Sequence, residues 1–397
     1  MRTYLDHNAT SPLRPRAKAA MLAAMDLTGN ASSVHAEGRA ARKLLDDARE
    51  QVARAVGVIA PMVVFTGGGS EANNLAIKGA PVQRLLVSAI EHPSVLEAAK
   101  ASGKAVEFIP VDGNGVVDLG ALKRMLAGTK ALVSVMLANN ETGVLQPVAD
   151  VVRLAHSHGA LVHTDAVQAL GKVPTNFGLL GVDLMTLSAH KLGGPVGSGA
   201  LIIRDGLPLE PLIHGGGQEL RRRAGTENLA AVAGFAIVAN EKLNAVRTLR
   251  DQLDSSLEGA IVFGASVERL PNTTCFAVPG MNAETLLMGF DLEGIAVSSG
   301  SACSSGKVAK SHVLAAMGVA PDIAKAAIRV SVGWDTTSDH IDQFIAAWSK
   351  ILARHKARTN SFVMPGRGPG ISHPSGKEMA GTLPGHDELK TAGLVNG

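Results

Sequence analysis

The chain has 397 residues, of which 46% are hydrophobic, and a formal net charge of only +3 at pH 7. That length can bury a large core and form more than one domain, whereas so small a charge and only 3% aromatic residues argue against a nucleic-acid-binding protein. Two cysteines exclude a disulfide framework and indicate a reducing compartment.

The amino terminus shows no apolar run of the kind found in signal peptides, and no window of the sequence is long and apolar enough to span a bilayer. We therefore expect a cytoplasmic protein that does not bind membranes.

Short runs rich in Val, Ile and Leu alternate with longer, charge-bearing segments as far as about residue 246. Fully apolar strands that alternate with helices predict a parallel sheet covered on both faces, with ligands at the carboxyl ends of the strands. The predicted strands are 62–65, 84–87, 131–136, 161–164 and 200–203, and the clearest helices are 38–56 and 93–100.

The pattern changes at about residue 246, where a charged helix (246–257) precedes a predicted strand (273–278) and a terminal helix from residue 338 to about 357. We expect a large domain over 15–246 and a smaller domain formed by 1–14 and 247–360. Eight Gly and four Pro without hydrophobic periodicity predict a disordered tail over 361–397.

A Gly-rich turn, Thr66–Asn74, follows the first predicted strand and opens a helix. Backbone amides at a helix amino end can bind an anion, and Gly69 and Ser70 are the candidates to approach a phosphate. The signal is weak alone, because such a turn is more often only a turn, and it matches neither the P-loop nor the dinucleotide-binding fingerprint.

Asp165 follows another predicted strand, and Gln168 comes three residues later. A buried carboxylate there needs a cationic partner, such as a protonated pyridine nitrogen, although by itself the aspartate is more readily a helix cap. Lys191, in Ser188–Pro195, follows an apolar run between small residues. It could form a Schiff base, because desolvation lowers a lysine pKa, although an exposed loop lysine is commoner.

Cys303 lies in Ser298–Lys307, where no large side chain could anchor the thiol in a core. An exposed thiol of this kind can reach outward, whereas a free cysteine is more often a small buried hydrophobe. Cys275, in an apolar predicted strand, fits that commoner role. His156 and His158 are interpreted as helix-end residues, and no metal site is expected, because no further Cys or His ligands lie nearby.

A lysine, a phosphate cradle and an acid are the groups that bind pyridoxal 5'-phosphate (PLP). With them, the chain resembles the cysteine desulfurases of the NifS/IscS type, in the class V branch of the fold-type-I PLP enzymes. The resemblance covers the chain to about residue 357, through motifs at Tyr4–Asp6, Gly29–His35, Thr66–Asn74, Glu91–Pro93, Asn139–Gly143, His163–Gln168, Ser188–Gly194, Gly215–Glu219, Arg223–Asn228, Ser298–Ser304 and Ile328–Ser331.

The resemblance implies an α/β fold of the fold-type-I PLP-dependent transferases. Its large domain would hold a mainly parallel, seven-stranded sheet covered by helices, and its smaller domain would be α+β and carry the Cys303 segment. In the cofactor site, Lys191 would form the Schiff base, Asp165 would keep the pyridine nitrogen protonated and Gln168 would bond the phenolic oxygen. His92 would stack on the ring and move protons, and Asn140 would lie near cofactor and substrate.

The resemblance also implies how the phosphate and the substrate are bound. Arg329 would bind the substrate carboxylate with its planar guanidinium. The phosphate would be held by Gly69, Ser70, Ser188 and His190, together with Thr226 contributed by the partner subunit of a homodimer.

The implied reaction removes sulfur from L-cysteine, which leaves L-alanine and a persulfide on Cys303. His92 would accept the substrate thiol proton, and the sulfur would pass to an iron–sulfur scaffold or another acceptor protein. Two alternatives stay open: a selenocysteine lyase or plain class V aminotransferase, which would not need Cys303, and a catalytically idle regulator. The complete set of predicted site residues argues against the idle regulator.

Three positions depart from the pattern of the family. Ser70 stands where threonine is frequent and keeps the hydroxyl, His7 and Asn8 replace a more usual pair, and Arg221 lies where glycine is common. Arg221 and Arg222 fit a solvated loop as well as a surface facing a partner subunit. These departures concern local loop geometry and not the reaction.

Overall fold

The computed structural model describes residues 2–128, 130–299 and 310–361. The chain divides by its internal contacts into two compact units, Met1–His355 and Lys356–Gly397. The first unit holds every strand of the described part. Beyond Ser361, the predicted tail lies outside the described residues. Among the residues that are described, no helix has the length and apolar character needed to cross a membrane.

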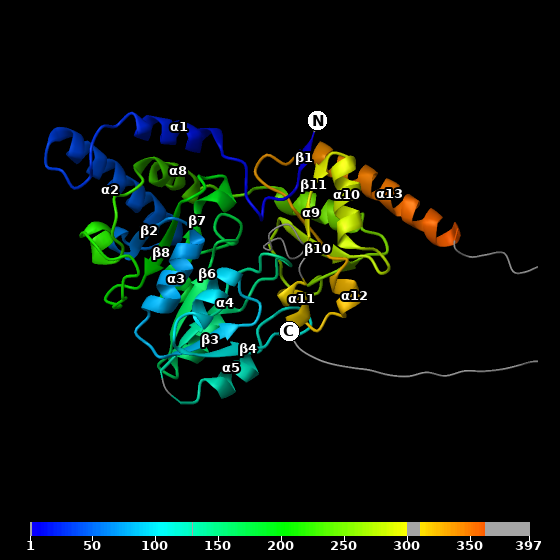
Figure 1. Cartoon of the computed structure of the whole chain (residues 1–397), viewed down its shortest axis with the longest axis horizontal. Coiled ribbons are helices and arrows are strands. Elements are labelled where there is room, and N and C mark those ends of the chain that lie inside the picture. Colours follow the sequence, from blue (N-terminus) through cyan, green and yellow to red (C-terminus); the bar gives the residue numbers. More distant parts are fainter. Residues whose placement is uncertain (1, 129, 300–309, 362–397) are drawn as a thin grey trace, which may run out of the picture. The chain divides into compact units, whose positions relative to one another are not determined.

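A seven-stranded sheet is the largest sheet of the structure, with the order β2-β8-β7-β6-β5-β3-β4 (Figure 1). Only β8 runs against its neighbours, so the mainly parallel sheet expected from the sequence is confirmed. The strands are β2 (Val63–Thr66), β3 (Arg84–Ser88), β4 (Ala105–Ile109), β5 (Leu132–Ser134), β6 (Leu161–Asp165), β7 (Leu184–Ser188) and β8 (Gly199–Ile203).

Helices cover both faces of this sheet because successive strand side chains point to opposite sides. Leu86 and Val133 pack into a cluster with α2, α6 and α8, whereas Leu85 and Leu132 pack into another with α3 and α4. The helices of this region are α1 (Pro15–Met25), α2 (Ala36–Val56), α3 (Gly69–Gly79), α4 (Pro93–Lys100), α5 (Leu119–Met125), α6 (Val148–His156), α7 (Phe177–Leu180) and α8 (Leu229–Ala239), with short 3-10 helices η1 (Ala60–Met62), η2 (Ala189–Leu192) and η3 (Gln218–Arg221).

The predicted elements are found with small shifts at their ends. Helix α2 begins at Ala36, where the His35 ring accepts a hydrogen bond from the Gly38 amide, and it ends at Gly57, whose φ of 71° suits glycine. Strand β4 was not predicted from the sequence, because it is an edge strand whose residues are mostly exposed and break the apolar pattern.

A second region of the fold has a four-stranded sheet of order β12-β13-β10-β9 and a separate pair, β1-β11. Its core is aromatic: the Phe276 and Trp348 rings meet edge to face at 5.4 Å, and Phe290 stacks on Phe344 at 5.0 Å. Its elements are β1 (Thr3–Tyr4), β9 (Ile261–Val262), β10 (Thr273–Ala277), β11 (Ile295–Ala296), β12 (Ser298–Ser299), β13 (Ile328–Ser331), α9 (Val246–Ser255), α10 (Ala283–Leu292), α11 (His312–Ala316), α12 (Pro321–Ala324) and α13 (Ser338–Ser361).

Cys275 is fully buried on β10, which confirms its interpretation as a core residue. The predicted domain boundaries stay a prediction. Each of the two sheet regions has its own main hydrophobic cluster. By its internal contacts, however, the chain places both regions in one compact unit.

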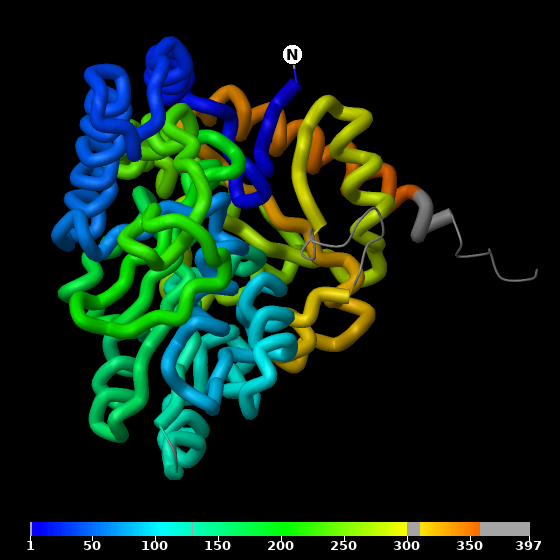
Figure 2. The backbone as a smooth tube through the Cα atoms, turned by 60° about the vertical axis from the view of Figure 1, so that its left-hand side comes forward, coloured from blue at the N-terminus to red at the C-terminus, as the bar shows by residue number. Residues whose placement is uncertain are grey.

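The N-terminal segment connects the two sheet regions (Figure 2). It pairs with β11 at Thr3 and Tyr4, bridges to Ser331 at Asp6, and bonds η2 where the Ser11 amide donates to the His190 carbonyl at 2.9 Å. This path brings Asp6 and Asn8 to the ends of strands from both regions.

A buried ion pair holds η3 against the sheet. Both guanidinium NH2 groups of Arg49 contact the Glu219 carboxylate, at 2.6 and 2.8 Å, and the carboxylate also accepts a bond from the Phe65 amide. Glu219, Leu220 and Arg221 all have positive φ, a conformation that is uncommon for residues other than glycine. The φ of 63° at Arg221 explains why glycine suits this position.

Replacing Arg49 should therefore destabilise the fold strongly. Arg49→Ala leaves a carboxylate whose side chain is 1% exposed without its counter-ion, and we expect the free energy of unfolding to fall by about 3–5 kcal/mol in chemical denaturation. The matched control is Lys43→Ala on the same helix, which removes an exposed pair with Asp47 and should leave that free energy nearly unchanged. Equal effects of the two substitutions would contradict the assignment.

Candidate active site

One cavity of about 290 Å³ opens at the carboxyl ends of β6 and β7, where the sequence pattern predicts a ligand. Most of the predicted site residues line it, although they come from elements far apart in the chain. These are Gly69, Ser70, His92, Asn140, Asp165, Gln168, Ser188, His190, Lys191 and Arg329. Asn8, Ala9, Asn73 and Ser94 also line the cavity and were not among the predicted site residues.

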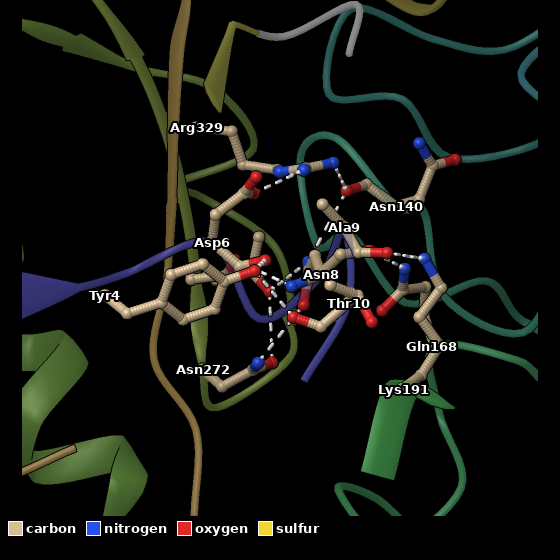
Figure 3. Close-up of polar contacts among 12 residues, drawn as sticks. Tyr4, Asp6, Asn8, Ala9, Thr10, Asn140, Gln168, Lys191, Asn272 and Arg329 are labelled. Carbon is tan, nitrogen blue, oxygen red and sulfur yellow. Dashed lines mark hydrogen bonds and ion pairs between the residues drawn. The ribbon is translucent and has the colours of Figure 1, made fainter. Parts of the chain in front are cut away.

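Lys191 lies on η2, directly after β7. Its Nζ donates hydrogen bonds to the main-chain carbonyls of Asn8, at 2.7 Å, and Ala9, at 2.8 Å (Figure 3). The Asn8 carbonyl also accepts a bond from Gln168 Nε2 at 2.9 Å. The N-terminal segment thus orients both the amine and the amide predicted to contact a cofactor.

Asp165 ends β6 and is 6% exposed. Its Oδ2 accepts a bond from Asn73 Nδ2 at 2.7 Å, and its Oδ1 accepts one from the Val167 amide at 2.9 Å. Asn73 also donates to Ser94 Oγ, which contacts His92 Nδ1. Asn73 lies within the predicted Gly-rich motif, one helical turn after Gly69, so helical spacing could have indicated a residue that faces the sheet.

His92 caps α4, because its Nδ1 accepts a bond from the Ser94 amide at 3.1 Å. Burial lowers the pKa of His92, nearby Lys191 and His312 lower it further, and Asp165 opposes them. The ring is therefore neutral at pH 7. Since Nδ1 accepts from a main-chain amide, the proton of the neutral ring lies on Nε2, and this tautomer can donate from Nε2.

Arg329 projects from β13 and is only 2% exposed. One guanidinium nitrogen pairs with Asp6 Oδ1 at 2.8 Å, and another donates to the main-chain carbonyl of Asn140 at 3.0 Å (Figure 3). Its Nε is buried without a hydrogen-bond partner in the described part of the chain. This arrangement presents a fixed cation to the cavity, suited to a carboxylate.

The turn from β2 into α3 is the anion cradle expected from the sequence. Gly68 has a φ of 142°, and a Cβ on Gly199 of β8 would lie only 2.6 Å from the Gly68 carbonyl carbon. Glycine at both positions therefore lets β8 approach the turn. The Ser188 side chain, at the end of β7, lies beside Gly69, so two strands converge on the amino end of α3.

His190 also borders this cradle and bonds Thr10 Oγ1 through its Nδ1 at 3.2 Å. Burial, followed by repulsion from Lys191 and Lys172, lowers the pKa of His190 to about 4. At pH 7 the imidazole is thus a neutral hydrogen-bonding group beside the cradle.

Two predicted residues are not placed in this cavity. Thr226 is exposed between η3 and α8 and does not line it. The neighbouring Arg223 pairs with Glu71 of α3 at 2.9 Å. Cys303 lies outside the described residues.

Two buried acids near the cavity were within predicted motifs but had no predicted role. Glu91 is fully buried, and burial followed by repulsion from Asp165 raises its pKa well above the usual range. Glu141 Oε2 accepts a bond from Ser311 Oγ at 2.5 Å. Burial raises the pKa of Glu141 to about 7, against the opposing influence of Ser311 and Arg329.

Outside the cavity, His156 is the last residue of α6, as predicted, and its Nε2 contacts the buried carboxylate of Asp183 at 3.0 Å. Arg222, next to Arg223 in the sequence, donates a hydrogen bond to the Pro61 carbonyl at 3.1 Å. Neither contact belongs to the cavity.

Gly199→Ala should weaken anion binding at the cradle. The new Cβ would force the Gly68 backbone away, and we expect at least about a tenfold loss in affinity for PLP, the cofactor expected from the sequence, because the turn amides would lose their alignment. Equilibrium titration of the apoprotein with PLP measures it. Gly113→Ala is the matched control, since its Cβ would meet only the Met317 carbonyl oxygen, at 3.9 Å. Wild-type affinity in Gly199→Ala would contradict the cradle.

Glu141 should make stability fall as pH rises. Its pKa in the fold, about 7, lies above the ordinary value of 4.5 for a glutamate, so its protonated form favours folding and that contribution is lost between these two values. Glu141→Gln removes this titration. We expect the stability of Glu141→Gln relative to wild type to rise by about 3 kcal/mol from pH 4.5 to 7. A pH-independent difference, measured by denaturant unfolding, would refute the raised pKa.

Known proteins resemble this chain over most of its length. The family model described as Aminotransferase class-V matches residues 3–344. The cysteine desulfurase IscS of Dictyoglomus turgidum is 39% identical over 90% of this chain and 96% of that protein. A cysteine desulfurase of Cereibacter sphaeroides is 43% identical over 90% of this chain and 97% of that protein.

Solved structures give the same result. A NifS-like protein from Rickettsia africae has a TM-score of 0.83 and 37% identity, covering 89% of this chain and 100% of that chain. The complex described as SspA with cysteine has a TM-score of 0.76 and 28% identity, covering 84% of this chain and 100% of that chain. The resemblance and the fold class inferred from the sequence are thereby confirmed.

Proposed function

Because this chain belongs to the class V aminotransferase family and is related over most of its length to cysteine desulfurases, we propose that it removes sulfur from L-cysteine with the help of PLP. L-alanine is the second product. The observation that carries this proposal is the cavity itself, which gathers Lys191, Asp165, His92 and Arg329 from four separate elements.

The residues around the cavity fit PLP. An amine suits its aldehyde, a buried carboxylate its pyridine nitrogen and an amide its phenolic oxygen, and these groups are Lys191, Asp165 and Gln168. The phosphate would be held by Gly69, Ser70, Ser188 and His190, joined by Thr226 from a partner subunit. When bound, PLP supplies an electron sink that weakens the bonds at the substrate α-carbon.

The protein side chains bind the substrate and move its protons. Arg329, held by Asp6, binds the carboxylate of L-cysteine beside Asn140. Lys191 Nζ moves the α-proton, and His92 donates from Nε2. The acceptance of the thiol proton by His92, predicted from the sequence, requires that the Nε2 proton has first left, because Nδ1 is occupied by the Ser94 amide.

Cys303 is the proposed sulfur acceptor. A lone pair of its thiolate forms the new S–S bond, while the Cβ–S bond of the substrate breaks and its electron pair stays with the carbon, which then takes up a proton. The products are a persulfide on Cys303 and L-alanine, so no external oxidant or reductant is consumed in this step.

We further propose a homodimer in the cytoplasm that passes the sulfur to an iron–sulfur scaffold or another acceptor protein. Support for the dimer comes from Thr226, which is exposed and lies away from the cavity of its own chain. If Thr226 binds the phosphate, as the family resemblance implies, it would do so in the cavity of a second copy of the chain.

The activity test uses purified protein with PLP, L-cysteine and a thiol reductant. The wild type should form alanine and sulfide in equal amounts, and Cys303→Ser should lower both by at least about 100-fold while keeping the visible cofactor band. Lys191→Ala should lose the covalent cofactor adduct detected by borohydride reduction and mass spectrometry.

Cys275→Ser is the matched control, because that thiol is fully buried on β10 and should not change the ratio of sulfide to alanine. Full desulfurase activity in Cys303→Ser would overturn the persulfide step. An unchanged covalent adduct in Lys191→Ala would overturn the assignment of the Schiff-base lysine.

A further inference from the structure

A second lysine, Lys172, lies behind the residues that line the cavity. It is 9% exposed, and its Nζ donates to Gln168 Oε1 at 3.0 Å and to Asn8 Oδ1 at 3.1 Å. Buried lysines normally pair with a carboxylate. Among the described residues, the hydrogen-bond acceptors of Lys172 are instead two neutral amide oxygens, and each belongs to a residue that lines the cavity.

The bond from Lys172 determines how the Gln168 amide is oriented. An ammonium group only donates, so Oε1 must face Lys172 and Nε2 must face the other way. Nε2 then donates one N–H to the Asn8 carbonyl at 2.9 Å. Since Gln168 lines the cavity and its Nε2 has no second acceptor among the described residues, the remaining N–H can serve an acceptor bound there, such as a phenolic oxygen.

The same lysine orients Asn8. Its Oδ1 accepts from Lys172 at 3.1 Å and from Asn272 Nδ2 at 3.2 Å (Figure 3). The Asn8 Nδ2 therefore turns to Thr273 Oγ1, at 2.8 Å. The main-chain carbonyl of Asn8 is the one that accepts from Lys191 Nζ. Lys172 therefore supports the position of both groups that contact the proposed Schiff-base lysine and its cofactor.

Lys172 also adds positive charge to this region. Burial, then repulsion from Lys191 and Arg329, lowers its pKa to about 7. Its charge also helps to lower the pKa values of His7 and His190. Repulsion between two ammonium groups is mutual, so a charged Lys172 disfavours a proton on a group at Lys191.

We propose that Lys172 is a positioning residue of the cofactor site, which holds the Gln168 amide with its N–H toward the cavity and places a positive charge behind Lys191. This inference rests on the proposed function, because PLP bound at Lys191 would respond to both effects. A donor to the phenolic oxygen and a nearby cation both favour loss of the proton from the cofactor–lysine linkage.

The test is a pH titration of the visible absorption band in the holoenzyme. Lys172→Met should raise the pH at which the band changes by roughly one unit, because it removes both the hydrogen bond that orients the Gln168 amide and the positive charge. Lys172→Arg, which keeps both, should stay near the wild-type value. In a Gln168→Ala background the shift caused by Lys172→Met should be smaller, because the part transmitted through the amide is already absent.

Lys104 provides a control for the loss of a partly buried lysine. Its Nζ donates to the main-chain carbonyls of Ile77 and Ala80, at 3.0 and 2.7 Å, and it does not line the cavity. Lys104→Met should lower the melting temperature without moving the band transition. A purely structural role of Lys172 would give the same result for Lys172→Met, and that outcome would overturn the inference.

If Lys172→Met does not fold, Lys172→Gln keeps an amide donor without the charge and should still shift the transition upward; an unchanged transition in that variant overturns the inference as well. A different result would overturn the proposed function. A wild-type protein that shows no visible band with PLP would overturn both, whereas a normal wild-type band with unshifted Lys172 variants overturns only the role of Lys172.

Discussion

The main-chain carbonyl of Asn8 is the acceptor on which the arrangement of the site depends. It accepts hydrogen bonds from Lys191 Nζ at 2.7 Å and from Gln168 Nε2 at 2.9 Å. Asn8 can do so because the N-terminal segment runs from the β1-β11 pair to η2, two elements distant in sequence. The same segment brings Asp6 to Arg329, so one stretch of chain orients the amine, the amide and the guanidinium.

Several basic groups lie near this carbonyl. Lys191, Lys172 and Arg329 bring three basic groups close together, and burial keeps His92 and His190 neutral near them. The carboxylates of Asp6, which pairs with Arg329, and Asp165 offset part of this positive charge, and a bound anion would offset the rest. A phosphate and a substrate carboxylate are anions of that kind, which is why the arrangement suits an amino acid bound with PLP.

Sequence patterns predicted much of this site, because its residues lie at the ends of apolar strands and in short, small-residue turns. Asp165 and Ser188 end strands that are buried on both faces, and Lys191 follows one of them. Such strands can be found in the sequence as short apolar runs. Strand β4 was missed because its exposed residues carry no apolar pattern. Asn73 and Lys172 were missed because a polar residue on a helix or turn has no local sign of its partners.

The amino-acid sequence predicts which chemical groups meet in this site: an amine, an acid and an amide that lie at or just after the ends of strands of a parallel sheet, and an arginine from the second sheet region. How these groups are oriented depends on contacts between distant parts of the chain. Hydrogen bonds such as those of Lys172 join residues from different elements, with Asn8 lying 164 positions away in the chain. Local periodicity reports which face of an element is buried, but it carries no information about which distant polar atom lies against that face.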